Sequence, residues 1–380
     1  MDRKMPPLPP PRIRSAPSHL LGMRTGTWLR VLKENNFAVD PPYFLSALSV
    51  GAASCLNSVC RVFDEMGSPR DGANPATDPI FVIGHWRSGT TLLHNLLAVD
   101  RRFATPNFSQ VFFPHSFITA DKPLRWFLKW ALPKKRQIDD MEVGPDLPQE
   151  DEFALCAMTG LSPYVAYAFP RNWRHYNRFL TFNDASDDEI AHWKNAMLSF
   201  VRKLTRVYNR PLILKSPPHT ARLRMLLDIF PNAKFVHVHR NPFQVFQSSC
   251  RTLSIGPPLL QMQHFDFSDL EELVLGRYET LYDMYLEQRS LVPSDNLYEM
   301  SFDSLTRDPI GSVEALYRAF SLPGFGELDA NLRAYTRSLA EYKPNLHSGL
   351  STSSALRVSE RWSRFFTTWG YSNDPLGTVT

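Results

Sequence analysis

The chain has 380 residues, of which 43% are hydrophobic and 21% are charged. These ordinary globular values exclude a disordered protein and a multi-span membrane protein, and the length suits one large α/β domain with appendages or two modest domains. A formal net charge of +4 is too weakly basic to indicate nucleic-acid binding, but it is compatible with an anionic ligand. The four cysteines form no C-x-x-C pair, which is typical of a reducing compartment.

Residues 1 to about 40 are rich in proline and arginine and predict an irregular arm that packs on the domain. Prolines, rather than an apolar segment, follow the first charged residues, so we expect no signal peptide and a cytoplasmic location. Residues 41–65 predict one helix that begins at two prolines. Its serines and Arg61 argue against a membrane span, so we expect at most peripheral contact with a membrane through this helix.

After a stretch rich in Gly, Pro, Asn and Asp, the pattern changes to short apolar runs typical of strands, each followed by a helical pattern. The runs lie at residues 80–83, 212–214, 235–238 and 297–302. Strand, helix and strand at this spacing imply right-handed crossovers. The sequence therefore predicts an α/β fold with a central parallel sheet flanked by helices.

Residues 107–205 interrupt this pattern with a long, aromatic-rich insertion that we expect to be helical. A second stretch, residues 252–266 around Gly256 and the prolines after it, predicts irregular structure. Insertions at the carboxyl edge of a parallel sheet usually build the substrate pocket. The aromatic residues of the insertion therefore predict an apolar acceptor pocket, although the same residues could form ordinary core.

The segment Gly84-His85-Trp86-Arg87-Ser88-Gly89-Thr90-Thr91 joins the first strand to a helix. Backbone N–H groups and the helix dipole converge on an anion at such a turn. Gly84 and Gly89 keep the glycine spacing of a nucleoside-triphosphate loop, but Thr90 replaces its lysine and the nearest cation is Arg87. No aspartate ends the 235–238 strand to organise Mg²⁺, so triphosphate hydrolysis loses both of its charge-neutralising parts.

The run Arg87-Ser88-Gly89-Thr90-Thr91 resembles the 5′-phosphosulfate loop of sulfotransferases that use 3′-phosphoadenosine 5′-phosphosulfate (PAPS), in which a basic residue precedes Ser/Thr-Gly-Thr-Thr. The resemblance implies that the loop amides and hydroxyls hold the 5′-phosphate. It also implies that Arg87 neutralises the bridging oxygen. Without a ligand, the same residues would be a helix capped by Ser88 and Thr90.

A second anion site is predicted where His239-Arg240-Asn241-Pro242 closes the 235–238 strand. Asn241 is a good N-cap and Pro242 a good first helical residue, and Ser248 lies about two helical turns further on. The pair resembles the 3′-phosphate site of the same family, with an arginine at the strand end and a serine eight residues later. The resemblance implies that Arg240 and Ser248 bind the 3′-phosphate; alone, the arginine could pair with a carboxylate.

The resemblance covers about residues 79 to 325 and implies a P-loop-like sulfotransferase domain over 76–380, with an acceptor-site insertion at about 107–205 and an N-terminal arm and helix over 1–75. It implies PAPS as co-substrate and in-line transfer, without a metal, to a hydroxyl or amine. Phe302 stands where a tyrosine often lies near the adenine, and Leu92 replaces an aromatic residue, so adenine packing must differ in detail. A further hypothesis is that the terminal segment around Tyr342, Lys343 and His347 takes part in binding the 3′-phosphate.

Lys215 ends the 212–214 strand and resembles the lysine that contacts the sulfuryl group in many sulfotransferases, although it could be a surface lysine. Two bases used elsewhere in the family are missing, because Pro217 replaces a histidine and no glutamate lies about twenty residues beyond the loop. A carboxylate or neutral imidazole must take the proton from the acceptor. We favour Glu152, then Glu150, with His219 as runner-up; the other candidates are Asp151 and His115.

Members of the sulfotransferase group with an arginine in the loop often carry a similar acidic motif, which supports this order. Any one of these acids could otherwise only complement the helix dipole. His237 and His239 alternate along a strand but have no third ligand at useful spacing, so no metal site is predicted.

Two rival functions remain open: an ATP-dependent small-molecule kinase, which would need a lysine after Gly89, and a non-catalytic nucleotide-binding protein. We expect a small-molecule or lipidic acceptor, and the sequence does not predict the oligomeric state.

Overall fold

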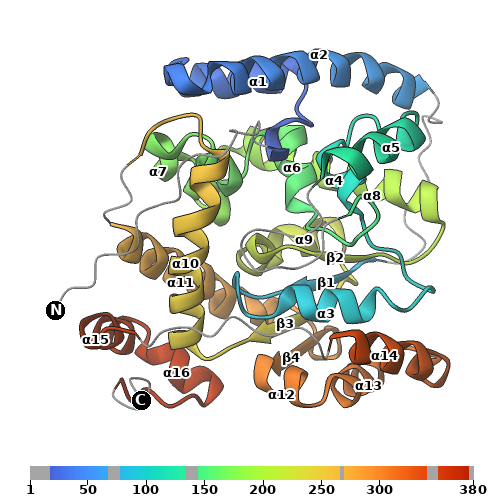
Figure 1. Ribbon diagram of the computed structural model, residues 1–380. Coiled ribbons are helices and arrows are strands. Elements are labelled where there is room, and N and C mark those ends of the chain that lie inside the picture. The colour runs from blue at the N-terminus through green and yellow to red at the C-terminus, as the bar shows by residue number, and fades with distance from the viewer. Residues whose placement is uncertain (1–17, 67–77, 133–143, 266–268, 340–349, 376–380) are drawn as a thin grey trace.

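The computed structural model describes residues 18–66, 78–132, 144–265, 269–339 and 350–375, and its centre is a four-stranded parallel sheet (Figure 1). The strand order is β2-β1-β3-β4. The strands are β1 (Ile80–Ile83), β2 (Ile213–Lys215), β3 (Lys234–His239) and β4 (Leu297–Ser301). The predicted parallel sheet is confirmed; β2 reaches one residue further than expected and so includes Lys215.

Alternation along the strands divides the core into two clusters, one on each face of the sheet. Ile80 and Val82 of β1 pack with the helices α3 (Thr90–Leu97), α13 (Pro309–Ala319) and α14 (Phe325–Leu339). Phe81 and Ile83 belong to the larger cluster, which contains the insertion and the helices α9 (Leu223–Ile229), α10 (Pro242–Leu260) and α11 (Leu270–Gln288). The remaining helices beside the sheet are α12 (Phe302–Arg307), α15 (Thr352–Arg361) and α16 (Ser363–Trp369).

The described part of the insertion is helical. It contains α4 (Phe108–Phe112), α5 (Asp121–Ala131), α6 (Glu152–Thr159), the 3₁₀ turn η3 (Pro163–Tyr167), α7 (Trp173–Asn177) and α8 (Asp187–Tyr208). A capping box in which Ser186 and Glu189 exchange hydrogen bonds fixes the start of α8. The insertion occupies the space between the sheet and an outer layer formed by the N-terminal helices (Figure 1).

That outer layer consists of α1 (Thr25–Glu34) and α2 (Phe44–Met66), preceded by the short turns η1 (Ser18–Leu20) and η2 (Pro41–Tyr43). The expected helix over 41–65 is present. The expectation of an irregular arm up to about residue 40 is wrong from residue 18 onward, because Trp28 and Val31 of α1 are buried against the domain. By length and composition, Pro41–Asp64 is the one helix among the described residues that is apolar enough to cross a membrane.

The irregular structure predicted for residues 252–266 is also wrong in its first part, since α10 continues to Leu260. Gly256 and Pro257 are buried, and the carbonyl of Pro257 accepts a hydrogen bond from the amide of Gln261. The next residue, Met262, donates its amide to the carbonyl of Ala168. Packing and these tertiary bonds therefore override the weak helix propensity of a glycine followed by prolines.

Candidate active site

The loop between β1 and α3 has the backbone conformation of an anion cradle. Gly84 has φ of +141° and Gly89 has φ of +104°, which are values that L side chains rarely adopt. A Cβ atom at Gly89 would also clash with the ring of Phe302. Arg87 has φ of +69°, an uncommon value for a residue other than glycine and one that is often found at ligand sites. The positive φ values at both glycines and the ring of Phe302 against Gly89 explain why this turn needs glycine at positions 84 and 89.

Ser88 places a buried hydroxyl in this loop. Its side chain is buried, and its Oγ has no hydrogen-bond partner among the described residues. Gly89 is the N-cap of α3 and offers no side chain to the free amides of the first turn. Because an unpartnered buried hydroxyl is costly, these donors fit an oxyanion such as a phosphate.

The second predicted phosphate site lies directly beside the first. The Arg87 Nε donates a hydrogen bond to Ser248 Oγ at 2.9 Å, and an Arg240 guanidinium N–H donates to the Arg87 carbonyl at 3.2 Å. The Arg240 guanidinium also lies 4.3 Å from the centre of the Phe302 ring. The structure thus brings the two predicted anion-binding segments, which contain Arg87 and Ser88 and Arg240 and Ser248, side by side.

Lys215 and Glu150 form a buried ion pair next to this cradle. The Lys215 Nζ lies 2.8 Å from Glu150 Oε1 and 3.4 Å from Thr91 Oγ1, and their side chains are only 3% and 14% exposed. The second carboxylate oxygen of Glu150 accepts a 2.5 Å hydrogen bond from the Tyr164 hydroxyl. Trp86 Nε1 donates to the same hydroxyl at 3.0 Å. Glu150 is therefore fixed between a cation on β2 and a phenol on the insertion.

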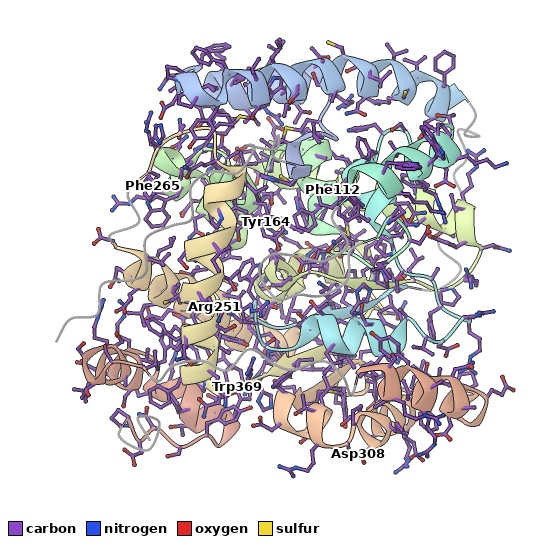
Figure 2. All side chains as sticks on the ribbon, viewed as in Figure 1. Phe112, Tyr164, Arg251, Phe265, Asp308 and Trp369 are labelled. Atoms are coloured by element: carbon purple, nitrogen blue, oxygen red, sulfur yellow. The ribbon has the colours of Figure 1, made fainter. Side chains whose placement is uncertain are left out.

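A cavity of about 160 Å³ opens at Glu150. Its lining combines Arg87, Thr90, Thr91 and Glu150 with aromatic and aliphatic side chains. In Figure 2, Tyr164 of η3 lies beside α10, where the insertion contacts that helix. The other lining residues are His85, Trp86, Phe153, Tyr167, Pro217, Ser249, Thr252, Leu253, Val274 and Arg277. The cavity therefore brings residues of the anion-binding loop and apolar side chains together around the Glu150 carboxylate.

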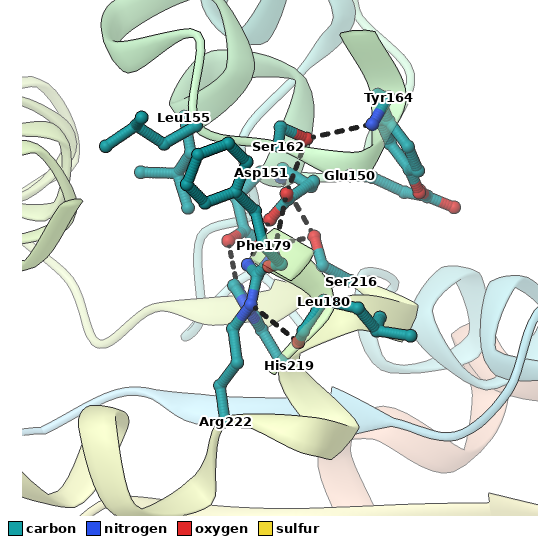
Figure 3. A network of polar contacts seen from close by, with 12 residues as sticks. Glu150, Asp151, Leu155, Ser162, Tyr164, Phe179, Leu180, Ser216, His219 and Arg222 are labelled. Carbon is teal, nitrogen blue, oxygen red and sulfur yellow. Dashed lines mark hydrogen bonds and ion pairs between the residues drawn. The ribbon is translucent and has the colours of Figure 1, made fainter. Parts of the chain in front are cut away.

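The other two acids of the cluster, Asp151 and Glu152, do not line the cavity and belong to a buried polar network, part of which Figure 3 shows. Glu152 forms a two-pronged ion pair with Arg222 at 2.6 and 3.1 Å, and it accepts a hydrogen bond from Ser162. All three side chains are buried, and Glu152 does not line the cavity. The geometry therefore reverses the preference for Glu152 over Glu150.

His219 belongs to the same network and also lies outside the cavity lining. Its Nε2 is 2.5 Å from Asp151 Oδ2, and Asp151 Oδ1 accepts a hydrogen bond from the Ser216 hydroxyl (Figure 3). Burial alone would raise the pKa of Asp151, but the nearby His219 and the hydrogen bonds to His219 and Ser216 hold it below its ordinary value. Asp151 and Glu152 thus anchor the segment that presents Glu150.

His115 is buried in a different part of the insertion. Burial and the nearby charges of Lys203 and Arg61 lower the pKa of its imidazole to about 3. It does not line the cavity. Tyr342, Lys343 and His347 lie outside the described residues. Among the residues that the structure does describe, no group of three or more His, Cys, Asp or Glu side chains could hold a metal ion.

Sequence reasoning missed two polar residues of the cavity. Arg277 on α11 is buried and lies 5.3 Å from the ring of Trp86, and Tyr167 contacts the same guanidinium through a hydrogen bond. His85 donates from Nδ1 to the Trp86 carbonyl at 2.7 Å, and burial lowers its pKa to about 3. An arginine within a long helix carries no local signal of burial, whereas His85 stood inside the loop motif.

Comparison with known proteins decides the family. The model of the sulfotransferase family matches residues 79–327, which include the loop, the Lys215–Glu150 pair and the Arg240–Ser248 site. The chain belongs to the sulfotransferase family. It is an enzyme of this kind, and its parallel sheet and P-loop-like fold are those of the family.

This sulfotransferase is 33% identical over 357 residues to the omega-hydroxy-beta-dihydromenaquinone-9 sulfotransferase Stf3 of Mycobacterium bovis and of Mycobacterium tuberculosis. The match covers 92% of the chain and 90% of each relative. Among solved structures, sulfotransferase STF9 from Mycobacterium avium superposes with a TM-score of 0.67 at 17% identity, covering 95% of this chain and 98% of that one. STF1 from Mycobacterium tuberculosis gives 0.65 at 19% identity, covering 93% and 94%. These two structures share the fold.

Proposed function

We propose that this sulfotransferase transfers the sulfuryl group of PAPS to the hydroxyl of an amphipathic, lipidic alcohol. The observation that carries the proposal is the position of the Lys215–Glu150 pair. It lies between a loop built for phosphate and a cavity lined by aromatic side chains. A kinase would instead need a lysine after Gly89, where this chain has Thr90.

The donor would be held by the two adjoining sites. The amides of the first turn of α3 and the unpartnered Ser88 hydroxyl suit the 5′-phosphate, with Thr90 and Thr91 beside them. Arg240 and Ser248 suit the 3′-phosphate, and Arg87, bonded to Ser248, would lie between the two groups. Charge-assisted bonds of this kind select a bisphosphorylated nucleotide over one that lacks the 3′-phosphate.

The chemistry follows from charge and position. During sulfuryl transfer, negative charge spreads over the sulfuryl oxygens, and a nearby cation stabilises the transition state. The Lys215 ammonium contacts Thr91 of the loop and is the natural group for that task. Glu150 would accept the proton of the attacking hydroxyl, while Tyr164, whose pKa burial and the neighbouring Glu150 raise well above its ordinary value, stays protonated and orients the carboxylate.

The acceptor end of the cavity supports a hydroxyl on an apolar carrier. Phe153, Tyr164, Tyr167, Leu253 and Val274 line it and offer apolar surface around the reacting group. The relatives named for a hydroxylated menaquinone point to the same class of acceptor, and we extend that class to this chain. All four cysteines are free, which accords with the cytoplasmic location that we propose.

The test is a transfer assay with PAPS and a series of acceptors. Long-chain primary alcohols dispersed in detergent should be sulfated much faster than sugars or peptides. Glu150→Gln should lose this activity, and Glu150→Asp should keep part of it, while both variants still bind the desulfated donor product. Preferential sulfation of sugars or peptides would overturn the acceptor class, and full activity of Glu150→Gln would overturn the role of Glu150.

A further inference from the structure

Helix α2 differs from an ordinary surface helix, because it turns polar side chains toward the domain and large apolar side chains toward solvent. The face toward the domain carries polar side chains, including Ser46, Ser54, Asn57 and Asp64, all of them buried. The face toward solvent is apolar, with Leu45 81% and Leu48 69% exposed. Its other exposed apolar residues are Phe44, Leu56, Val59, Val62 and Phe63. A continuous apolar row along a helix of this length is unusual for a surface that faces water and marks an interaction site.

Specific hydrogen bonds hold the polar face on the domain. Asn57 Nδ2 donates to the carbonyls of Leu21 and Met23 at 2.6 and 3.0 Å. Asp64 accepts bonds from the amide and hydroxyl of Thr119 and lies 2.8 Å from the Lys203 ammonium. A membrane span would have to break these bonds and place Asp64 in hydrocarbon. The helix is therefore arranged to lie along a surface with its outer face available.

A cationic cavity of about 430 Å³ adjoins this face. Arg24 and Arg30 of the α1 region and Arg61 of α2 line it, and no carboxylate is among its described lining residues. The Glu34 carboxylate lies 3.8 Å from Arg30 Nε, one helical turn along α1. Val62 both lines the cavity and belongs to the exposed apolar row, so the positive charge and the apolar surface are continuous.

The remaining lining residues add polar contacts without opposing charge. They are Gly26, Thr27, Ser58 and His192. Burial and the nearby Arg30 lower the pKa of His192, which keeps its imidazole neutral near pH 7. The net charge of the lining is therefore positive, and it complements an anionic headgroup.

We propose that the outer face of α2, together with the Arg24–Arg30–Arg61 cavity, docks this enzyme on a bilayer that contains anionic lipids. The apolar row enters the interfacial region, and the arginine cavity takes a lipid phosphate. An amphipathic helix with apolar and basic surfaces side by side binds membranes in this orientation. Helix α5, which starts near Asp64, exposes Trp126 and Trp130, two residues of the type that favours the membrane interface.

The docking face is connected to the active site through α10. Gln261 at the end of α10 donates a 2.7 Å hydrogen bond to the Tyr43 hydroxyl at the start of α2. Leu253 lines the acceptor cavity about 10 Å back along the same helix. Docking would therefore hold the acceptor end of the cavity close to the bilayer. This step alone rests on the proposed lipidic acceptor; membrane binding itself does not.

The binding test uses the full chain and vesicles of phosphatidylcholine with or without phosphatidylglycerol. Wild type should sediment with the anionic vesicles, and binding should weaken as salt is added. Leu45→Asp/Leu48→Asp should weaken it by about tenfold per leucine, and Arg24→Gln/Arg61→Gln by about fivefold per arginine. Leu356→Asp and Arg318→Gln, exposed controls on α15 and α13 away from α2 (Figure 1), should bind as wild type does.

Cys55, an exposed residue of α2, allows a direct readout of depth. In a Cys60→Ser/Cys250→Ser background, an environment-sensitive fluorophore on Cys55 should shift to shorter wavelength with anionic vesicles and not with neutral ones. Absence of vesicle binding, or equal binding by Leu45→Asp/Leu48→Asp, would overturn the proposal. A wild-type dimer that these two substitutions convert to a monomer, without any effect on vesicle binding, would assign the face to a second copy of the chain instead.

Discussion

The donor half and the acceptor half of the active site are built in different ways. The donor half comes from two short segments, residues 84–91 and 240–248, each of which follows a strand of the sheet. The acceptor half is assembled from two segments that are far apart in the sequence, α6 with η3 and α10 with α11. Glu150 and Lys215 join the halves. A site made of local motifs is readable in a sequence, whereas one made of tertiary contacts is not.

The largest expected effect is that of Glu150→Gln, which should abolish transfer but leave nucleotide binding intact. Replacing it with glutamine removes the proposed base, so kcat should fall by about 10²- to 10⁴-fold. Because the donor half is untouched, binding of 3′-phosphoadenosine 5′-phosphate measured by calorimetry should change little. The comparison breaks down if nucleotide binding is lost together with activity while the thermal stability of the variant stays that of wild type.

Glu152 should matter for stability rather than for chemistry. Glu152→Ala leaves Arg222 as an unpaired buried charge, which should cost about 3–5 kcal/mol of unfolding free energy in denaturant titrations. The double variant Glu152→Ala/Arg222→Met is the matched control and should recover part of that loss. If Glu152→Ala instead folds as stably as wild type and is inactive, Glu152 and not Glu150 performs the proton transfer.

Acid should destabilise the whole fold through buried histidines of the donor side. Burial lowers the pKa of His85 in the loop and of His94 in α3 to about 3, from 6.5 in the unfolded chain. Above pH 6.5 both imidazoles are neutral in the folded and the unfolded chain, so the free energy of unfolding does not depend on them. Between pH 6.5 and 3 only the unfolded chain binds the proton, and the free energy of unfolding falls by about 1.4 kcal/mol per histidine per pH unit. Unfolding free energies measured at several pH values should decline below 6.5, and His94→Gln should flatten the decline. A stability that is constant down to about pH 4 would contradict this account.

The smallest expected effect is on the acceptor side alone. Tyr164→Phe removes one hydrogen bond to Glu150, worth about 1–1.5 kcal/mol, so kcat/KM for the acceptor should fall about fivefold to tenfold. The KM for the donor should stay within about twofold, since the donor-loop residue bonded to Tyr164 is Trp86, and the proposed phosphate ligands Ser88, Arg240 and Ser248 keep their contacts. Steady-state kinetics with each substrate varied in turn measures both. If Tyr164→Phe changed only the KM for the donor, the division into a donor half and an acceptor half would be wrong.

Much of the fold could be predicted from the sequence because its signals are local. Apolar runs gave the strands, and the turn residues from Gly84 to Thr91 gave the anion cradle. The choice between Glu150 and Glu152 could not be predicted, since it depends on Arg222, seventy residues further along, which pairs with one of them. Arg277 and the continuation of α10 through Pro257 were missed for the same reason: packing between distant segments decides them.

The orientation of the apolar row on α2 also could not be predicted from the sequence. Its composition predicted a helix, but only the structure shows that Ser46, Ser54, Asn57 and Asp64 face inward while the leucines face outward. Periodicity alone would place the apolar face inward. The inversion depends on partners such as Leu21, Met23 and Thr119, whose backbone groups satisfy the polar side chains.

The most direct test of the central claim is calorimetric binding of 3′-phosphoadenosine 5′-phosphate, without added metal, to wild type and to Arg240→Ala. We expect wild type to bind it far more tightly than ADP, because we propose that Arg240 and Ser248 bind the 3′-phosphate, and we expect Arg240→Ala to lose most of that preference. Equal affinity for the two nucleotides, or tighter binding of ADP with Mg²⁺, would contradict the PAPS site and favour the kinase alternative.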